Sequence, residues 1–174
     1  FLGNTRPNNW YGLRSRSGHD GFRFFVHDAE HTLLNVNENR LGPFSAGDTS
    51  VTYSSPQWVW QKLWANPEFK LRVADRAHRH CFNGGALTPA AARERLLRRM
   101  AEIDRAVVGE SARWGDAKRG TPFTRDDWLA AANSVLNGFL PQRTDRVISQ
   151  LKTRGLYPNV AAAAQDRGRR RGRP

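Results

Sequence analysis

The first regular pattern along the chain is a pair of aromatic-rich runs on either side of a polar, glycine-containing segment. Residues 9–27 read NWYGLRSRSGHDGFRFFVH, with SGHDG between the two runs. Aromatic residues favour strands, whereas Gly, Ser and Asp favour tight turns. The pattern predicts a β-hairpin with strands near Trp10–Arg16 and Phe22–His27, joined by a loop of about five residues.

A long polar segment follows the predicted hairpin. Residues 35–56 read NVNENRLGPFSAGDTSVTYSSP, which is rich in Asn, Gly, Ser and Pro and has no clear hydrophobic period. Such a segment is typical of a surface loop, and long loops in compact domains are often functional.

After residue 56 the apolar positions recur at helical spacing. Asn66–Pro67 predicts a helix start, because Asn is a favoured N-cap and Pro suits the first helical position. Asn83–Gly85 predicts its end. Between them a four-residue spacing marks the inward face, formed by Phe69, Val73, Ala77 and Cys81.

A second helix is expected to begin in the same way at Thr88–Pro89, with a break before Ala106–Arg113. Its apolar face consists of Leu96, Leu97, Met100 and Ile103. Thr124 and Asp127 have the spacing of a capping box, which predicts the start of a third helix. The inward positions of that helix are Trp128, Leu129, Ala132, Leu136 and Phe139.

The last predicted helix runs from Gln142 to Arg154, with Gly155 as its C-terminal cap. Its inward residues are Val147, Ile148 and Leu151. The expected fold class is therefore α+β and mostly α-helical, with an N-terminal β-hairpin packed on a bundle of about four or five helices. Residues 159–174 are expected to form a disordered, basic, low-complexity tail.

Composition narrows the class of protein. A chain of 174 residues fits one domain, and 39% hydrophobic against 25% charged residues excludes wholesale disorder. The net charge of +12 favours anionic partners, and the single cysteine, Cys81, excludes an internal disulfide. No transmembrane segment or signal peptide is recognisable, and a chain that begins at Phe1 is expected to be a fragment.

The predicted hairpin gathers polar side chains at its open end. If Arg16 and Phe22 close the loop, Trp10 lies opposite Asp28 and Asn9 lies beside Ala29. Antiparallel neighbours are about 4.5–5.5 Å apart at Cα, so carboxamide and carboxylate oxygens can converge on a hard cation such as Mg²⁺. The candidate ligands are Asn8, Asn9, Asp28 and Glu30. The alternative is that Asn and Asp only form turns here.

Five segments, taken in order, resemble the CotH (spore-coat protein H-like) kinase family. They read GNTRPNNWYGLR, FRFFVHDAEHTL, NPEFKLRVADRAHRHCFNGGALTP, EIDRAVVGESARWGD and FLPQRTDRVISQLKTRGLYP. The resemblance covers about residues 1–158 and implies the C-terminal lobe of an atypical protein-kinase-like fold. It also implies an extracellular or cell-envelope protein Ser/Thr kinase that uses ATP with Mg²⁺ or Mn²⁺.

By motif match, the resemblance gives Asn9 the role of the metal-binding Asn and Asp28 that of the metal-binding Asp, with Glu30 as a further acid. The family commonly has an Asp upstream of the paired Asn, but here Thr5 is followed by Arg6 and no acid precedes Asp20. The family usually has an aromatic residue where this chain has His27. The catalytic residue that would orient the attacking hydroxyl is therefore missing.

The nucleotide-covering half of a kinase is also missing, because no glycine-rich phosphate loop occurs in the sequence. We therefore expect a weakly active or inactive kinase lobe with nucleotide and protein substrate as partners. Two alternatives remain: a non-catalytic kinase-like interaction domain, and nucleic-acid binding through the arginine-rich tail.

Two further motifs have both a functional and a plain interpretation. His78, His80 and Cys81 suggest zinc, but residues two apart on a helix point to different faces. The tryptophans in WVWQKLW suggest a stacking surface, but Trp60 and Trp64 share a helical face and favour core packing.

Overall fold

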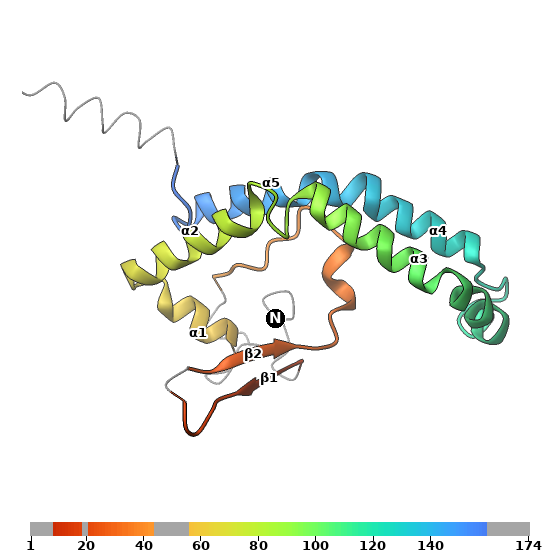
Figure 1. Ribbon diagram of the computed structural model, residues 1–174, viewed down its shortest axis with the longest axis horizontal. Helices are drawn as coiled ribbons and strands as arrows, with labels where there is room; N and C mark the ends of the chain where they lie inside the picture. The colour runs from red at the N-terminus through yellow and green to blue at the C-terminus, as the bar shows by residue number, and fades with distance from the viewer. Residues whose placement is uncertain (1–8, 19–20, 44–55, 160–174) are drawn as a thin grey trace, which may run out of the picture. The chain divides into compact units, whose positions relative to one another are not determined.

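The computed structural model describes residues 9–18, 21–43 and 56–159, with the backbone alone for residues 30 and 31 (Figure 1). The chain divides into two compact units, one formed by residues 1–75 with 148–174 and the other by residues 76–147. The fold is α+β and mostly helical, with an N-terminal two-stranded antiparallel hairpin. None of the helices in the described ranges is long and apolar enough to cross a membrane.

The hairpin consists of β1 (Trp10–Leu13) and β2 (Arg23–Val26). Trp10 pairs with Val26, so the predicted pairing of Trp10 with Asp28 was wrong by two residues. The strand ends early because the following residues bond locally, and the Gly18 N–H donates to Ser15 Oγ at 3.0 Å. A shift of two leaves each side chain on its predicted face of the hairpin.

A short 3-10 helix, η1 (Glu30–Leu33), follows the hairpin. The first part of the predicted loop is well anchored in its own unit: Trp60 Nε1 donates to the Leu41 carbonyl at 3.0 Å, and Gln150 Nε2 donates to the carbonyls of Asn37 and Glu38. Leu41 is buried. Residues 44–55 of that predicted loop lie outside the described residues.

Helix α1 (Pro56–Leu63) precedes α2 (Pro67–Cys81). The predicted cap of α2 is confirmed, because Asn66 Oδ1 accepts from the N–H groups of Glu68 and Phe69 at 2.9 and 3.2 Å. The predicted stop is confirmed as well. Gly84 has a φ of 75°, and a Cβ on Gly85 would lie 2.3 Å from the Arg79 carbonyl oxygen. That approach requires a residue without a side chain.

Helix α3 (Pro89–Trp114) begins where the sequence predicted but is not capped as expected. The Thr88 hydroxyl donates to the Gly85 carbonyl at 2.8 Å and caps no amide of α3. The predicted break before Ala106 was wrong, because α3 continues through it. The one glycine in this stretch, Gly109, costs about 1 kcal/mol relative to Ala, which a helix of 26 residues tolerates.

The rest of the chain is helical from Arg125 to Thr153, as α4 (Arg125–Ser134), a π-helical turn η2 (Val135–Phe139) and α5 (Leu140–Thr153). The capping box is confirmed, with the Thr124 N–H donating to Asp127 Oδ2 at 2.8 Å. Arg125 also donates from Nε to Asp104 Oδ1 at 2.8 Å, which joins the start of α4 to α3.

The end of α5 is a Schellman motif. The Leu156 N–H donates to the Leu151 carbonyl at 2.9 Å, the Gly155 N–H donates to the Lys152 carbonyl at 3.0 Å, and Gly155 has a φ of 65°. Leu151 and Leu156 are both buried. The motif therefore fixes both the end of the helix and part of the core.

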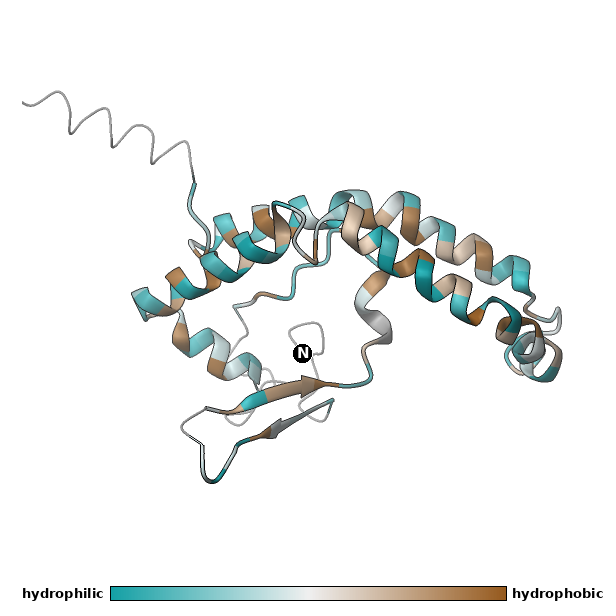
Figure 2. Cartoon of the chain, in the orientation of Figure 1, coloured by the Kyte–Doolittle hydropathy of each residue, from teal (hydrophilic) through white to brown (hydrophobic). Residues whose placement is uncertain are grey.

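Buried apolar side chains are few and are divided between the units. Unit one buries Leu41, Ile148, Leu151 and Leu156, and unit two buries Cys81, Leu136 and Phe139. Hydrophobic residues also lie along the hairpin (Figure 2). No described residue of β1 or β2 is buried, although both strands are rich in aromatic residues.

Candidate functional site

The candidate site lies at the open end of the hairpin, where the chain enters β1 and leaves β2. Asn9 immediately precedes β1, and its carbonyl accepts from the His27 N–H at 3.2 Å. This bond extends the strand pairing by one residue beyond Trp10 and Val26. The expectation that Asn9 lies beside Ala29 was therefore wrong, and His27 lies opposite Asn9 instead.

The side chains of Asn9 and Asp28 are nevertheless in contact, as the sequence predicted. Asn9 Nδ2 donates to Asp28 Oδ2 at 3.0 Å. Asp28 has a φ of 53°, which turns the chain sharply at the end of β2. Asp is one of the few residue types besides Gly that adopt this left-handed conformation readily. The contact across the hairpin therefore depends on the local turn at Asp28.

The side chains of the other two predicted ligands, Asn8 and Glu30, are not among those that the structure describes. Asn8 is outside the described residues, and for Glu30 only the backbone is described, as the first residue of η1. The site that can be assessed is therefore the pair formed by Asn9 and Asp28.

The chemistry of this pair fits part of the shell of a hard cation. Mg²⁺ is typically bound by one or two carboxylates, several waters and the phosphates of a substrate. Asp28 supplies a carboxylate, and rotation of the Asn9 carboxamide about χ2 would present Oδ1 in place of Nδ2. Within the described ranges no group of three or more His, Cys, Asp and Glu side chains is placed to hold a metal. A cation held by this pair alone would take the rest of its ligands from water or from a substrate.

An exposed aromatic strip lies on the same face of the hairpin as Asn9. Tyr11 stacks on Phe25 with ring centroids 5.3 Å apart, and on His27 at 6.4 Å. Tyr11 is 52% exposed and Phe25 is 40% exposed. His27 therefore continues a row of stacked rings that ends opposite Asn9.

The opposite face of the hairpin is also aromatic. Trp10 meets Phe24 edge to face at 5.6 Å, and Phe22 stacks on Phe24 at 6.2 Å. Gly12 leaves room for this packing, since a Cβ there would lie 3.4 Å from the Phe24 ring. The contact between Trp10 and Phe24 crosses from β1 to β2 and holds together the strands next to Asn9 and Asp28.

The histidines and cysteine of α2 do not form a zinc site with one another or with any other described side chain. His78 stacks on Phe82 at 5.1 Å, and Cys81 is buried. Burial raises the pKa of the Cys81 thiol, because a thiolate is poorly solvated there. His78 thus takes part in ring packing, and Cys81 belongs to the core of unit two.

The tryptophans of WVWQKLW pack within their own unit. Trp60 meets Trp64 edge to face at 6.3 Å and Phe69 at 5.6 Å. The core-packing interpretation of Trp60 and Trp64 is thus supported by their ring contacts.

The sequence analysis did not predict one local cluster, which follows the C-terminal end of α3 at Trp114. The Arg119 guanidinium lies 3.6 Å from the centroid of the Phe123 ring and 2.9 Å from Asp127 Oδ2. The Phe123 N–H donates to the Gly115 carbonyl at 2.8 Å. A Cβ on Gly115 would lie 2.5 Å from the Ser111 carbonyl oxygen, so the close return of the chain requires glycine. The sequence around Trp114 and Gly115 therefore indicates the end of a helix followed by a turn.

Comparison with known proteins finds no relative of this chain. No protein-family model matches the chain, and no match is found among curated proteins or solved structures.

Proposed function

We propose that the Asn9–Asp28 end of the hairpin is the metal-binding part of a nucleotide site, in the C-terminal lobe of a CotH-type kinase-like domain. The proposal is supported by the contact between these two side chains at 3.0 Å, because they are the two positions that the resemblance assigns to metal binding. They are 19 residues apart in the sequence, and a turn-forming role for each alone does not require them to meet.

The roles follow from the chemistry of each group. Asp28 would supply the charged ligand. Asn9 would supply a neutral oxygen once its carboxamide has rotated out of the hydrogen bond that it donates to Asp28. Mg²⁺ or Mn²⁺ bound there would neutralise charge on the phosphates of ATP. The protein substrate would present a Ser or Thr hydroxyl, and the same resemblance favours an extracellular or cell-envelope setting.

We expect binding of metal–ATP but little phosphate transfer by this chain. The sequence has no acid upstream of Asn9 to orient a hydroxyl. Loss of a general base alone costs on the order of 10²–10⁴-fold in rate. A non-catalytic kinase-like lobe is therefore the second candidate, and this missing acid is the observation that favours it.

Manganese binding tests the site directly, because bound Mn²⁺ changes the relaxation of water protons. The chain is titrated with Mn²⁺ alone and with Mn²⁺–ATP, and tighter binding is expected with ATP because the two side chains leave most of the metal shell to other ligands. Asp28→Asn should weaken Mn²⁺–ATP binding by at least about tenfold, since it removes the charged ligand. Asp75→Asn, at an exposed acid on α2, is the matched control and should bind like the unmodified chain.

Two outcomes separate the candidates. Equal Mn²⁺–ATP binding by Asp28→Asn and Asp75→Asn would show that Asp28 does not bind the metal, which contradicts the proposed site. Absence of Mn²⁺–ATP binding by the unmodified chain would favour the non-catalytic interaction domain. Transfer is measured with labelled ATP, Mn²⁺ and a Ser-rich peptide. Robust transfer that Asp28→Ala abolishes would contradict the expected inactivity.

The basic tail offers a test against nucleic acid as the partner. Deletion of Gly168–Pro174 removes four of the arginines and should leave Mn²⁺–ATP binding unchanged, because the proposed ligands lie in the hairpin. If the deletion abolished all ligand binding while the intact chain bound DNA or RNA with a steep salt dependence, the nucleic-acid alternative would be correct.

A further inference from the structure

The π-helical turn η2 ends at a carbonyl whose next amide in the hydrogen-bond ladder is missing. The Leu140 N–H donates to the Val135 carbonyl, which is the five-residue spacing of a π-helix. The next amide in that ladder would belong to residue 141, which is proline and has no N–H. The Leu136 carbonyl is therefore left without its helical donor, and Arg93 from α3 takes that place.

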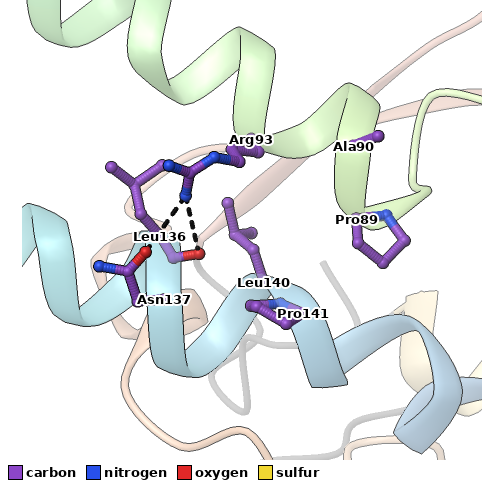
Figure 3. Close-up of a pocket in the computed structure, with 7 residues that line it drawn as sticks. All are labelled: Pro89, Ala90, Arg93, Leu136, Asn137, Leu140 and Pro141. Carbon is purple, nitrogen blue, oxygen red and sulfur yellow. Dashed lines mark hydrogen bonds between the residues drawn. The ribbon is translucent and has the colours of Figure 1, made fainter.

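Arg93 contacts η2 through one nitrogen. Its Nη1 donates to the Leu136 carbonyl at 3.4 Å and to Asn137 Oδ1 at 3.2 Å (Figure 3). A guanidinium has five N–H donors, and these two contacts use Nη1 alone. Within the described part of the chain, Nη2 and Nε of Arg93 make no hydrogen bond, so one edge of the fork remains available.

A pocket of about 250 Å³ lies beside this guanidinium, inside unit two. Its walls are mostly apolar, and α3 borders it on one side while η2 and the start of α5 border it on the other (Figure 3). The lining includes Pro89, Ala90, Arg93, Leu136, Leu140 and Pro141. None of the described residues that line the pocket is acidic, so Arg93 gives the lining a positive charge.

We propose that this pocket binds a small organic anion, in which one carboxylate or phosphate is carried by a short apolar group. The anion pairs with the Arg93 guanidinium, because a guanidinium forms charge-assisted hydrogen bonds with such groups. The apolar group covers Leu140 and Pro141. Pockets for drug-sized ligands hold roughly 300–1,000 Å³, so this one suits a smaller molecule. The pocket shares no residue with the proposed metal site, since every residue that lines it belongs to unit two.

Benzoate is the probe, because it combines one carboxylate with one apolar ring. The full chain, labelled with nitrogen-15, is titrated and the amide shifts of Ala90, Arg93 and Leu140 are followed. Acetate tests the charge alone, benzyl alcohol tests the ring alone, and phenyl phosphate tests the alternative anion. Saturable shifts are expected with benzoate at millimolar concentrations, with at least about tenfold weaker binding of acetate and of benzyl alcohol.

Two variants separate ligand binding from folding. Arg93→Gln should abolish benzoate binding, but it also removes the contact between α3 and η2. Ala90→Phe fills the pocket and leaves the contacts of Arg93 in place, so it should also abolish binding. Ala112→Phe, at another exposed alanine of the same helix, is the matched control and should bind benzoate like the unmodified chain.

The proposal is overturned if benzyl alcohol binds as tightly as benzoate, because the anion would then be irrelevant. Equal binding of acetate and benzoate, unchanged binding in Ala90→Phe, or no saturable shift with benzoate would overturn it as well. Binding of an acidic peptide without binding of benzoate or phenyl phosphate would show that the occupant is a protein segment, which also contradicts it.

Discussion

The hairpin and the C-terminal end of α5 both belong to unit one, yet the hairpin leaves apolar side chains exposed and the end of α5 buries them. Leu13 and Phe22 of the hairpin region are 58% and 62% exposed, whereas Leu151 and Leu156 are 6% and 1% exposed. A two-stranded hairpin by itself is marginally stable in water. The comparison shows that the proposed metal site lies on the part of the unit that gains least from core burial.

The two regions are also held by different kinds of contact. The hairpin relies on ring pairs such as Tyr11 with Phe25, each of which contributes about 0.5–1.5 kcal/mol beyond the area that it buries. The end of α5 combines a Schellman motif with buried leucines. We therefore expect the hairpin to open more often than α5, and metal–nucleotide binding to stabilise the hairpin in particular.

Leucine truncation gives the largest contrast. Leu156→Ala should lower the free energy of unfolding by about 2–5 kcal/mol, because it removes a fully buried side chain and leaves a cavity. Leu13→Ala should change it by about 0.5 kcal/mol or less, since Leu13 is 58% exposed. Urea unfolding measures both. If the Leu13 variant lost as much stability as the Leu156 variant, the exposed hairpin described here would be covered in solution.

Two glycines of unit two extend the comparison, because substitution by alanine should change the stability of the fold in opposite directions at the two positions. Gly115→Ala should cost about 1–3 kcal/mol, because its Cβ would lie 2.5 and 2.6 Å from two carbonyl oxygens. Gly109→Ala should stabilise by about 0.5–1 kcal/mol, because Gly109 is inside α3 and nothing lies within 4 Å of its Cβ. Thermal unfolding of both variants checks the signs, and a stable Gly115→Ala would contradict the tight return of the chain at Phe123.

The turn at Asp28 gives a smaller effect within the hairpin. Asp28→Ala and Asp28→Gly both remove the carboxylate that contacts Asn9, but only glycine adopts a φ of 53° without strain. The alanine variant should therefore be less stable by about 1 kcal/mol. Hydrogen exchange at the His27 amide, which donates to the Asn9 carbonyl, reports this locally. Equal exchange in the two variants would mean that residue 28 is not left-handed in solution.

The sequence predicted the helices well where their signals were local. The Asn66 cap, the capping box of Thr124 and Asp127 and the end at Gly155 each involve residues within a few positions of one another. The hairpin register was missed because it depends on where the loop closes, and local bonds at Ser15 lengthen that loop. The η2 turn was missed because the sequence suggested a separate helix from Gln142, whereas the structure continues the helix through Pro141.

The contact between Asn9 and Asp28 was expected from a hairpin register that the structure does not have. Asn9 and Asp28 meet although the register differs by two residues, because the left-handed turn at Asp28 brings its carboxylate back toward Asn9. Neither that turn nor the contact of Arg93 with η2 has a readable sequence pattern. The contact that the turn makes possible joins residues 19 positions apart in the chain, and the contacts of Arg93 join residues 43 or 44 positions apart.

The smallest expected effect concerns pH and belongs to unit two. The pKa of Asp127 is lowered from its ordinary value of 3.8, first by the hydrogen bond from the Thr124 N–H and then by the hydrogen bond from Arg119. A carboxyl whose pKa is lower in the folded state stabilises the fold above its unfolded pKa, and this stabilisation is lost as the pH falls through the folded value.

The contribution of Asp127 should therefore be complete at neutral pH, begin to fall near pH 3.8 and disappear at more acidic pH. Asp127→Asn removes the titrating group but keeps a side chain that can still accept from the Thr124 N–H. Compared with the unmodified chain, it should be less stable at pH 7, and the difference should shrink below pH 3.8. Urea unfolding at several pH values measures this. A difference that stays constant down to strongly acidic pH would show that the Asp127 charge does not contribute, and that the cap acts through hydrogen-bond geometry alone.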